Sequence, residues 1–187
     1  MQLAIFGGSF DPVHIAHITI VEQALEELNI NKIIVVPTYL NPFKTNYHLE
    51  PKLRYELLKK VFQKNKKVEV CDFEIKQNKA VPSIETVNYL KNLYKPSKIY
   101  LIIGADNLKS LEKWYKYEEL NSLVEFVIAT REGYEGNKLD SYKVLNVNIN
   151  ISSSKLRDEI DLNFIPYQIK DDIIHHIKYE KVNFEQN

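Results

Sequence analysis

Apolar residues recur along the chain in short runs that alternate with longer stretches of amphipathic pattern. The strand-like runs are Leu3–Phe6, Lys32–Val36, Val68–Ile75, Lys98–Ile103, Glu125–Thr130 and Val144–Val147. Between them, apolar side chains recur at helical spacing, as at Ile18, Val21, Leu25 and Leu28, and again at Leu53, Leu57, Leu58 and Val61. Strand and helix therefore alternate. Several runs are apolar on both faces, which predicts an α/β fold with a mainly parallel twisted sheet of about six strands and helices on both faces.

Local signals mark the ends of two further helices. Ser83 is a candidate cap for a helix over Ile84–Tyr94, and Pro166 suits the start of a helix over Tyr167–Tyr179. The chain has 187 residues, enough for one full-sized core, and we find no repeat, low-complexity segment or linker in it. We therefore expect a single domain over residues 1–187.

The loop after the first strand contains the richest chemistry in the sequence. It runs from Gly7 to His17 and leads into an amphipathic stretch, so we expect a strand-to-helix turn. Such turns hold phosphates, because backbone N–H groups and the positive end of the helix dipole face the ligand. His14 and His17 share one face of the first helical turn. Gly7, Pro37 and Gly104 each follow a strand, so we expect their loops to meet at one crevice beyond the carboxyl ends of the strands.

Composition narrows the classes of protein. Lysine and arginine number 25 and aspartate and glutamate 25, for a formal net charge of +0, so no global charge favours nucleic acid or an anionic membrane. The lysines of Lys59–Lys67 fit a solvated helix face. Cys71 is the single cysteine, which suits a reducing compartment, and no signal peptide or membrane-spanning run is evident. We therefore expect a cytoplasmic protein.

The first loop carries a family resemblance. Gly8–His17 resembles the G-[ST]-F-D-P-x-H-x-G-H signature of the nucleotidyltransferase superfamily, with Ala16 where glycine is usual. It is neither a P-loop nor the G-x-G-x-x-G fingerprint. A second segment, Ile151–Arg157, is similar to the I-S-S-T-x-I-R motif of the same superfamily, and its serines can cap a helix and donate to phosphate oxygens. The resemblance implies a Rossmann-like fold and adenylyl or cytidylyl transfer.

Three further segments resemble the nicotinate-nucleotide and nicotinamide-nucleotide adenylyltransferases. Gly104–Leu108 with Trp114 is similar to their G-x-D…W region. Pro82–Leu90 is similar to P-S-Y-T-x-x-T-L, although Ile84 and Glu85 replace the common Tyr-Thr. Asn41–Lys44 resembles the P-P-H-K loop, with Phe43 in place of histidine. Phe164–Ile169 also fits the family, so the resemblance extends over nearly the whole chain.

The resemblance implies a reaction between Mg-ATP and nicotinate mononucleotide that gives nicotinate adenine dinucleotide and pyrophosphate. The expected catalytic residues are His14, His17, Lys44 and Arg157. The expected ATP-binding residues are Gly7, Gly8, Ser9, Phe10, Gly104, Asp106, Ile151, Ser153 and Ser154. The expected mononucleotide-binding residues are Thr86, Trp114, Tyr115 and Arg131. Mg²⁺ is expected on the ATP phosphates without a protein metal site, in a monomer or small homo-oligomer.

Several of these residues also have interpretations other than the functional roles given above. His14 and His17 could hold zinc, but no third ligand stands near them in sequence. Trp114 could fill the core, and Asp106 could cap a helix. Arg131 is either a phosphate ligand or an exposed loop residue, while His175 and His176 suit a structural or solvent-exposed place. The rival functions are nicotinamide-nucleotide or pantetheine-phosphate adenylyltransferase, and a nucleotide-binding sensor without catalysis.

Overall fold

The computed structural model describes residues 1–40, 46–131, 139–147, 149 and 151–176, with only the backbone of residue 131. Six parallel strands form one sheet in the order β3-β2-β1-β4-β5-β6. The strands are β1 (Gln2–Gly8), β2 (Lys32–Pro37), β3 (Val68–Val70), β4 (Lys98–Gly104), β5 (Glu125–Arg131) and β6 (Lys143–Val147). The predicted α/β fold with a parallel sheet is confirmed.

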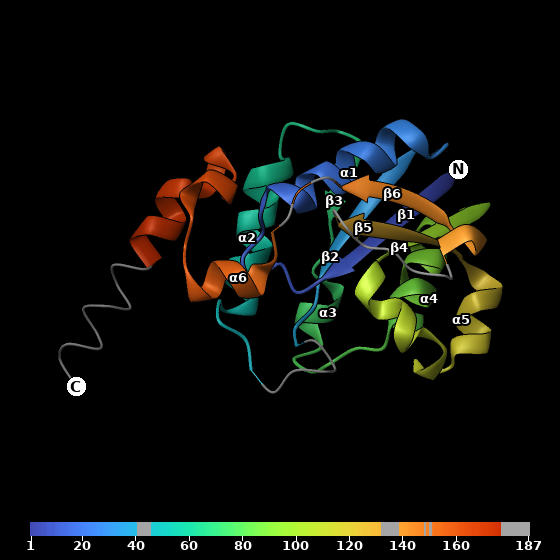
Figure 1. Ribbon diagram of the computed structural model, residues 1–187. Helices are drawn as coiled ribbons and strands as arrows, with labels where there is room; N and C mark the ends of the chain where they lie inside the picture. The colour runs from blue at the N-terminus through green and yellow to red at the C-terminus, as the bar shows by residue number, and fades with distance from the viewer. Residues whose placement is uncertain (41–45, 132–138, 148, 150, 177–187) are drawn as a thin grey trace.

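Helices cover both faces of the sheet (Figure 1). They are α1 (Ile15–Glu27), α2 (Pro51–Phe62), α3 (Phe73–Lys76), α4 (Ser83–Tyr94), α5 (Tyr117–Leu123) and α6 (Ser153–Asp158). Short 3₁₀ helices span Ala105–Lys109, Leu111–Lys113, Leu139–Ser141, Leu162–Phe164 and Tyr167–Ile169, and residues 170–176 are helical. Among the described helices, none is long and apolar enough to cross a bilayer.

The alternation of side chains along the strands divides the core into two layers. On one face, Phe6 of β1 packs in a cluster with Val21 of α1, Leu57 of α2 and Leu156 of α6. On the other face, Ile5 packs in a cluster with Ile84 of α4 and Leu120 of α5. Strands buried on both sides are the reason that the sequence is apolar at consecutive positions.

The sheet contains a topological switch point between β1 and β4. The chain places β2 and β3 on one side of β1 and then returns to place β4, β5 and β6 on the other. In β1, Ile5 is in register with Ile34 of β2 and with Leu101 of β4. The loops after β1 and β4 therefore diverge to opposite faces and leave a crevice between them, as such sheets do.

Some predicted boundaries differ from those observed. The strand predicted over Val68–Ile75 ends at Val70, and Phe73–Lys76 forms α3. Phe73 is apolar for a reason other than strand packing: its ring stacks on the ring of Tyr89 in α4, with centroids 4.1 Å apart. The N-cap of α4 is Pro82, and Ser83 is the first helical residue. Pro166 is the N-cap of the helical segment, as predicted, but the first turn, Tyr167–Ile169, is 3₁₀, and the α-helical part begins at residue 170.

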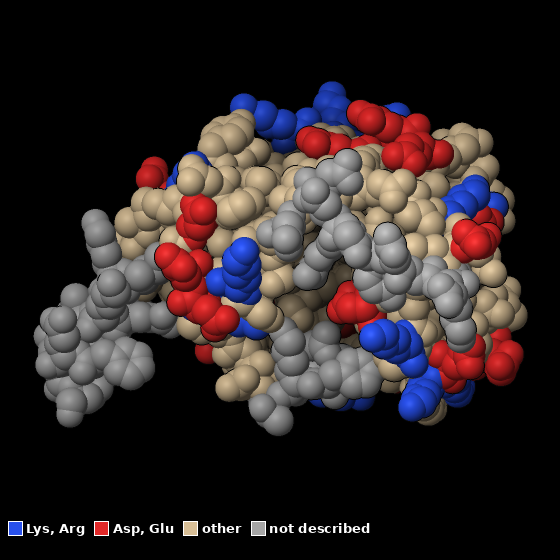
Figure 2. Space-filling model, in the orientation of Figure 1, with Lys and Arg blue, Asp and Glu red and all other residues tan. Residues whose placement is uncertain are grey.

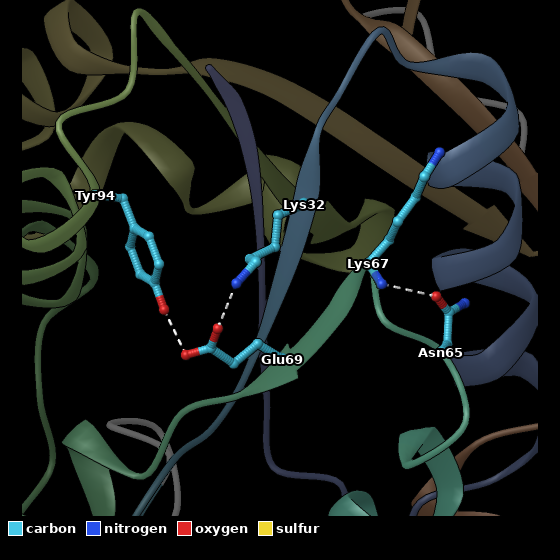
Figure 3. A network of polar contacts seen from close by, with 5 residues as sticks. All are labelled: Lys32, Asn65, Lys67, Glu69 and Tyr94. Carbon is cyan, nitrogen blue, oxygen red and sulfur yellow. Dashed lines mark hydrogen bonds and ion pairs between the residues drawn. The ribbon is translucent and has the colours of Figure 1, made fainter.

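A polar network fastens the short edge strand β3 (Figure 3). Lys32 of β2 contacts Glu69 at 2.7 Å, and the hydroxyl of Tyr94 at the end of α4 donates to the other Glu69 oxygen. Partial burial raises the pKa of Glu69, but the hydrogen bonds from Lys32 and Tyr94 outweigh it, so this pKa lies below its usual value. The network connects a strand of three residues to its neighbours at the end of the sheet remote from the crevice.

Candidate active site

Two adjoining cavities open at the carboxyl ends of β1 and β4. The first has a volume of about 410 Å³, and the second of about 340 Å³. Gly7, Gly8, Gly104 and Asn107 line both of them. The predicted crevice is therefore present, and Thr38 after β2 joins its wall, held by a hydrogen bond from its N–H to Gly8 O at 2.9 Å.

The glycines of the first loop have different roles. A Cβ on Gly8 would lie 3.1 Å from the Phe10 ring, which packs against this position, whereas a Cβ on Gly7 would meet no atom within 4 Å. Phe10 itself takes a left-handed conformation with φ of 48° and lies buried in the core. A side chain at Gly8 would therefore press on the Phe10 ring, while the open space over Gly7 belongs to the crevice.

The two histidines form a stacked pair at the start of α1. Their ring centroids lie 3.7 Å apart with an interplanar angle of 26°, and the edge of Phe10 supports the His17 ring at 4.9 Å. His14 is the N-cap residue, and its backbone N–H donates to His17 Nδ1 at 3.2 Å. Because Nδ1 accepts this hydrogen bond, the proton of the neutral His17 ring lies on Nε2. Both residues line the first cavity.

Two buried residues of opposite charge, which the sequence analysis missed, shape this loop. The Asp11 carboxylate accepts hydrogen bonds from the N–H groups of His48 and Leu49 at 2.8 and 2.7 Å. Arg54 of α2 is 1% exposed, and its guanidinium donates to the carbonyls of Ser9, Tyr39 and Leu49. Burial lowers the pKa of Arg54, and the charge of Asp11 opposes that shift. The signal was present in the sequence, since Arg54 interrupts the apolar stripe of α2.

The second motif docks directly onto the first. Ser152 is the N-cap of α6, and its side chain accepts from Lys155 N at 3.2 Å, which confirms the capping predicted for these serines. Ser153 donates its hydroxyl to Pro12 O at 3.1 Å. Arg157 donates to Asp11 O at 2.8 Å and to Ser154 Oγ at 2.9 Å. All three serines line the first cavity, so segments at opposite ends of the chain build one wall.

The loop after β4 forms the opposite wall of the first cavity. Asp106 is exposed and lines this cavity, and its carboxylate folds back so far that a Cβ on Gly104 would lie 2.5 Å from Oδ1. The side chain of Asn107 donates to Gly104 O at 3.2 Å. The N-cap of the 3₁₀ helix that follows is Gly104, without a side-chain cap, so Asp106 does not act as the N-cap there.

The second cavity has mostly apolar walls. Val81, Pro82, Trp114 and Tyr115 line it together with Glu74 and Lys113. Trp114 is half-buried and also packs against the core beside α4 and α5, while Tyr115 is 61% exposed. Trp114 therefore both fills core space and forms part of the cavity wall. Thr86 is buried and does not line the cavity; its hydroxyl donates to Glu74 Oε1 at 2.6 Å.

Glu74 is the most perturbed acid of this region, and no pattern in the sequence pointed to it. Burial raises its pKa from the ordinary 4.5 to about 7, against the lowering effect of the Thr86 hydrogen bond, and the nearby charge of Glu85 adds to the rise. A carboxyl with a pKa near neutrality at a cavity wall is a candidate functional group.

We expect Glu74→Gln to gain stability relative to the parent chain as pH rises. The native pKa lies above the unfolded one, so the favourable contribution of Glu74 is full below pH 4.5 and is lost as pH rises through 7. Since a glutamine side chain does not ionise, the advantage of the variant should grow by about 2–3 kcal/mol between pH 5 and pH 8. Urea unfolding at both pH values measures this difference. As a control, Glu26→Gln, an exposed change on α1, should show no such trend. If Glu74→Gln also shows none, the pKa of the Glu74 carboxyl is not raised.

Some predicted site residues fall outside what the structure describes. Lys44 and its neighbour Phe43 lie outside the described residues, and so does the side chain of Arg131, whose backbone ends β5. Ile151 is buried in the core and does not line either cavity. Among the described residues, no group of three or more histidine, cysteine, aspartate or glutamate side chains could hold a metal ion.

Charged side chains of both signs are intermixed around the molecule on the face shown in Figure 2, where a hollow opens near the middle. An acidic group stands at the edge of this hollow. The described part of this face carries no single-sign patch of the kind that long polyanions require.

Comparisons with known proteins identify relatives of this chain. Residues 5–159 match the family described as cytidylyltransferase-like. A protein of Aliarcobacter butzleri, named probable nicotinate-nucleotide adenylyltransferase, is 60% identical over 97% of this chain and 100% of its own length. One of the same name from a Nitratiruptor species is 48% identical over 93% of this chain and 97% of its own. The structure of Plasmodium falciparum nicotinic acid mononucleotide adenylyltransferase complexed with NaAD superposes with a TM-score of 0.76 at 25% identity, covering 96% of this chain and 97% of that one.

Proposed function

This chain belongs to the nicotinate-nucleotide adenylyltransferase family, within the cytidylyltransferase-like group, and on that premise we propose that it transfers the adenylyl group of ATP to nicotinate mononucleotide. The products are nicotinate adenine dinucleotide and pyrophosphate, on the route to NAD. The observation that carries the proposal is the stacked histidine pair at the mouth of α1, beside the glycines shared by two adjoining cavities.

The reaction needs electrostatic help more than a general base. The nucleophile is an oxygen of the mononucleotide phosphate, whose second pKa is about 6, so it is already ionised at neutral pH. Repulsion between two polyanions and the charge on the transferring α-phosphate oppose the reaction. Catalysis therefore consists of positioning the two phosphates and neutralising them.

His14 and His17 are the groups proposed to neutralise the transferring phosphate. The His14 N–H holds His17 Nδ1, which fixes the ring and leaves its Nε2–H as the donor. The positive end of the α1 dipole stands behind both rings. His14 is 3% exposed, so water screens its interactions weakly.

We assign the ATP phosphates to the wall made by α6 and the first loop. Ser154 and the N-terminus of α6 lie on the first cavity, and Arg157 orients Ser154 while it fixes the loop through Asp11 O. Ser9 and Phe10 line the same cavity and supply backbone near the phosphates. Arg157 is therefore proposed to position the site as well as to attract the triphosphate, and Lys44 is proposed as a second cation for it.

Adenosine is assigned to the part of the first cavity near the end of β4. Asp106 is the exposed carboxylate there and suits the ribose hydroxyls, and Gly104 allows the close approach. Mg²⁺ is proposed to enter as part of the Mg-ATP substrate, because the described residues offer no metal cluster and this ion keeps phosphate oxygens and water as ligands.

The second cavity is proposed to take the pyridine mononucleotide. Trp114 offers an aromatic face at its wall, and Tyr115 and Pro82 add further apolar surface. Its junction with the first cavity at Gly7 and Gly8 brings the mononucleotide phosphate to the histidine pair.

We expect Trp114→Ala to weaken mononucleotide binding about tenfold while the KM for ATP changes less than about twofold. The stacking surface is lost only from the second cavity, so the two substrates should respond differently. Steady-state kinetics with each substrate varied in turn measures the effect, and Trp114→Phe, which keeps an aromatic ring, should retain part of the affinity. Equal losses for both substrates would place Trp114 in the core alone.

Pyrophosphate release measured with three acceptors tests the proposed function. Nicotinate mononucleotide should give the highest kcat/KM, above nicotinamide mononucleotide, and phosphopantetheine should give none. A preference for the amide or for phosphopantetheine would make the chain the corresponding adenylyltransferase. ATP binding without turnover on any acceptor would support the nucleotide-binding sensor.

A further inference from the structure

Glu74 presents an incompletely satisfied carboxyl in the wall of the second cavity. Glu74 is 5% exposed and belongs to α3, which packs against β2. Thr86, near the start of α4, contacts its side chain. Glu74 Oε1 accepts the Thr86 hydroxyl at 2.6 Å. Its Oε2 is buried and has no hydrogen-bond partner among the described residues. A buried polar atom in this state requires a partner from elsewhere.

The hydrogen bond from Thr86 decides where a proton resides. Since Oε1 receives the Thr86 hydrogen, a neutral Glu74 carries its own hydrogen on Oε2. That O–H is a donor without an acceptor in the described part of the protein. A ligand oxygen in the adjoining cavity would satisfy it, and an anionic oxygen would do so about twice as strongly as a neutral carbonyl.

We propose that Glu74, as a neutral acid, donates a hydrogen bond to the pyridine carboxylate of nicotinate mononucleotide and so makes the site prefer the acid over the amide. The inference rests on the proposed function, which supplies the substrate. The apolar surfaces of Val81, Pro82 and Trp114 line the same cavity as Glu74, so one cavity offers a stacking surface and a proton donor. Once ionised, Glu74 would repel the acid and instead accept a hydrogen bond from the carboxamide N–H of the amide.

The charges around Glu74 favour the neutral form. The charge of Glu85 in α4 raises the pKa of Glu74, in addition to the larger effect of burial. The described part of β2 offers the cavity no charged side chain, because its only ionic residue, Lys32, pairs with Glu69 at the other end of the strand. Lys113 and Tyr115 line the cavity wall formed by the loop after β4. The pKa near 7 places the change of state in an accessible pH range.

The dependence of substrate preference on pH tests the proposal. Trp114 is the single tryptophan of the chain and lines the cavity, so quenching of its fluorescence reports mononucleotide binding without turnover. The titrations use both mononucleotides at pH 6–9 with saturating α,β-methylene-ATP, which cannot transfer its adenylyl group. Both ligands carry the same phosphate, so its ionisation affects both Kd values equally and does not change their ratio.

We define the preference as the Kd of the amide divided by the Kd of the acid. This ratio should exceed one below pH 7 and should fall by at least about tenfold by pH 8.5. Glu74→Gln mimics the neutral acid, because its amide can accept from Thr86 and donate to the ligand, so its ratio should favour the acid at every pH. Thr86→Val removes a hydrogen bond that lowers the pKa of Glu74, so the fall should move to higher pH. Glu85→Gln, a matched exposed change on α4, should move it to lower pH.

The role of Glu74 is overturned if the Kd ratio of the parent chain does not change with pH, or if the ratio of Glu74→Gln falls as much as that of the parent. If both mononucleotides still bind in that case, the proposed function remains intact. Absence of quenching by either mononucleotide overturns both the role of Glu74 and the proposed function. Circular dichroism of each variant excludes loss of fold as the cause of a change.

Discussion

Replacing His17 with alanine is expected to lower turnover by at least about a hundredfold while the chain stays folded. The His17 ring lies over His14 and is half-buried, so few core contacts are lost with it. What is lost is the fixed Nε2 donor at the transferring phosphate. Loss of one such donor typically raises the barrier by about 3–4 kcal/mol.

Two further substitutions separate the donor from the support that His17 gives to the loop. Asparagine can accept the His14 N–H near the position of Nδ1 but has no atom near Nε2. Glutamine reaches the Nε2 position with an N–H donor. We expect His17→Asn to lose nearly as much turnover as His17→Ala, and His17→Gln to retain more. Pyrophosphate release at saturating substrates measures all three, and near-normal turnover of folded His17→Asn would refute the donor role.

Replacing Arg54 with methionine is expected to destabilise the protein by about 3–5 kcal/mol. The guanidinium satisfies the carbonyls of Ser9, Tyr39 and Leu49, and it lies near the buried Asp11 carboxylate. Methionine fills the volume but leaves three buried or part-buried carbonyl acceptors without this donor and Asp11 without its neighbouring cation. Urea unfolding followed by circular dichroism measures the loss.

Two variants of the same helix serve as controls for Arg54→Met. Lys52 is exposed on α2, so Lys52→Met should change the free energy of unfolding by less than about 0.5 kcal/mol. Arg54→Lys keeps the charge but cannot reach three carbonyls at once, so it should fall between the two. If Arg54→Met is as stable as Lys52→Met, then the hydrogen bonds from Arg54 to the three carbonyls contribute little, and the loop is held by Asp11 alone.

The sequence predicted the fold well because its signals are local. Runs apolar on both faces alternate with helical periodicity, and this pattern is compatible with few architectures other than a covered parallel sheet. The cap at Ser152 and the turn after β1 were also readable, since each depends on neighbouring residues. The strand predicted over Val68–Ile75 failed at the point where the contacts of Phe73 and Glu74 became long-range.

Within the candidate site, too, some residues could be predicted from the sequence and others could not. The sequence pointed to His14, His17, Ser153, Ser154 and Asp106, and the structure brings them to one cavity. It offered no reason to choose Glu74, and it marked Arg54 only as an exception in an apolar stripe. Thr86, expected at the mononucleotide, lies behind Glu74 instead.

By itself the sequence determined the alternation of most strands and helices and the phosphate-binding turn, because these follow from neighbours along the chain; the distant residues around the turn were indicated by the family motifs. Only the tertiary structure decided that Arg54 ties three separate loop carbonyls together and that Asp11 O receives Arg157. It also decided that Glu74 is buried against Thr86 at a cavity wall. The physical reason is that burial and partners across many residues of sequence set the protonation of a carboxyl and the placement of a buried cation, and no local pattern encodes them.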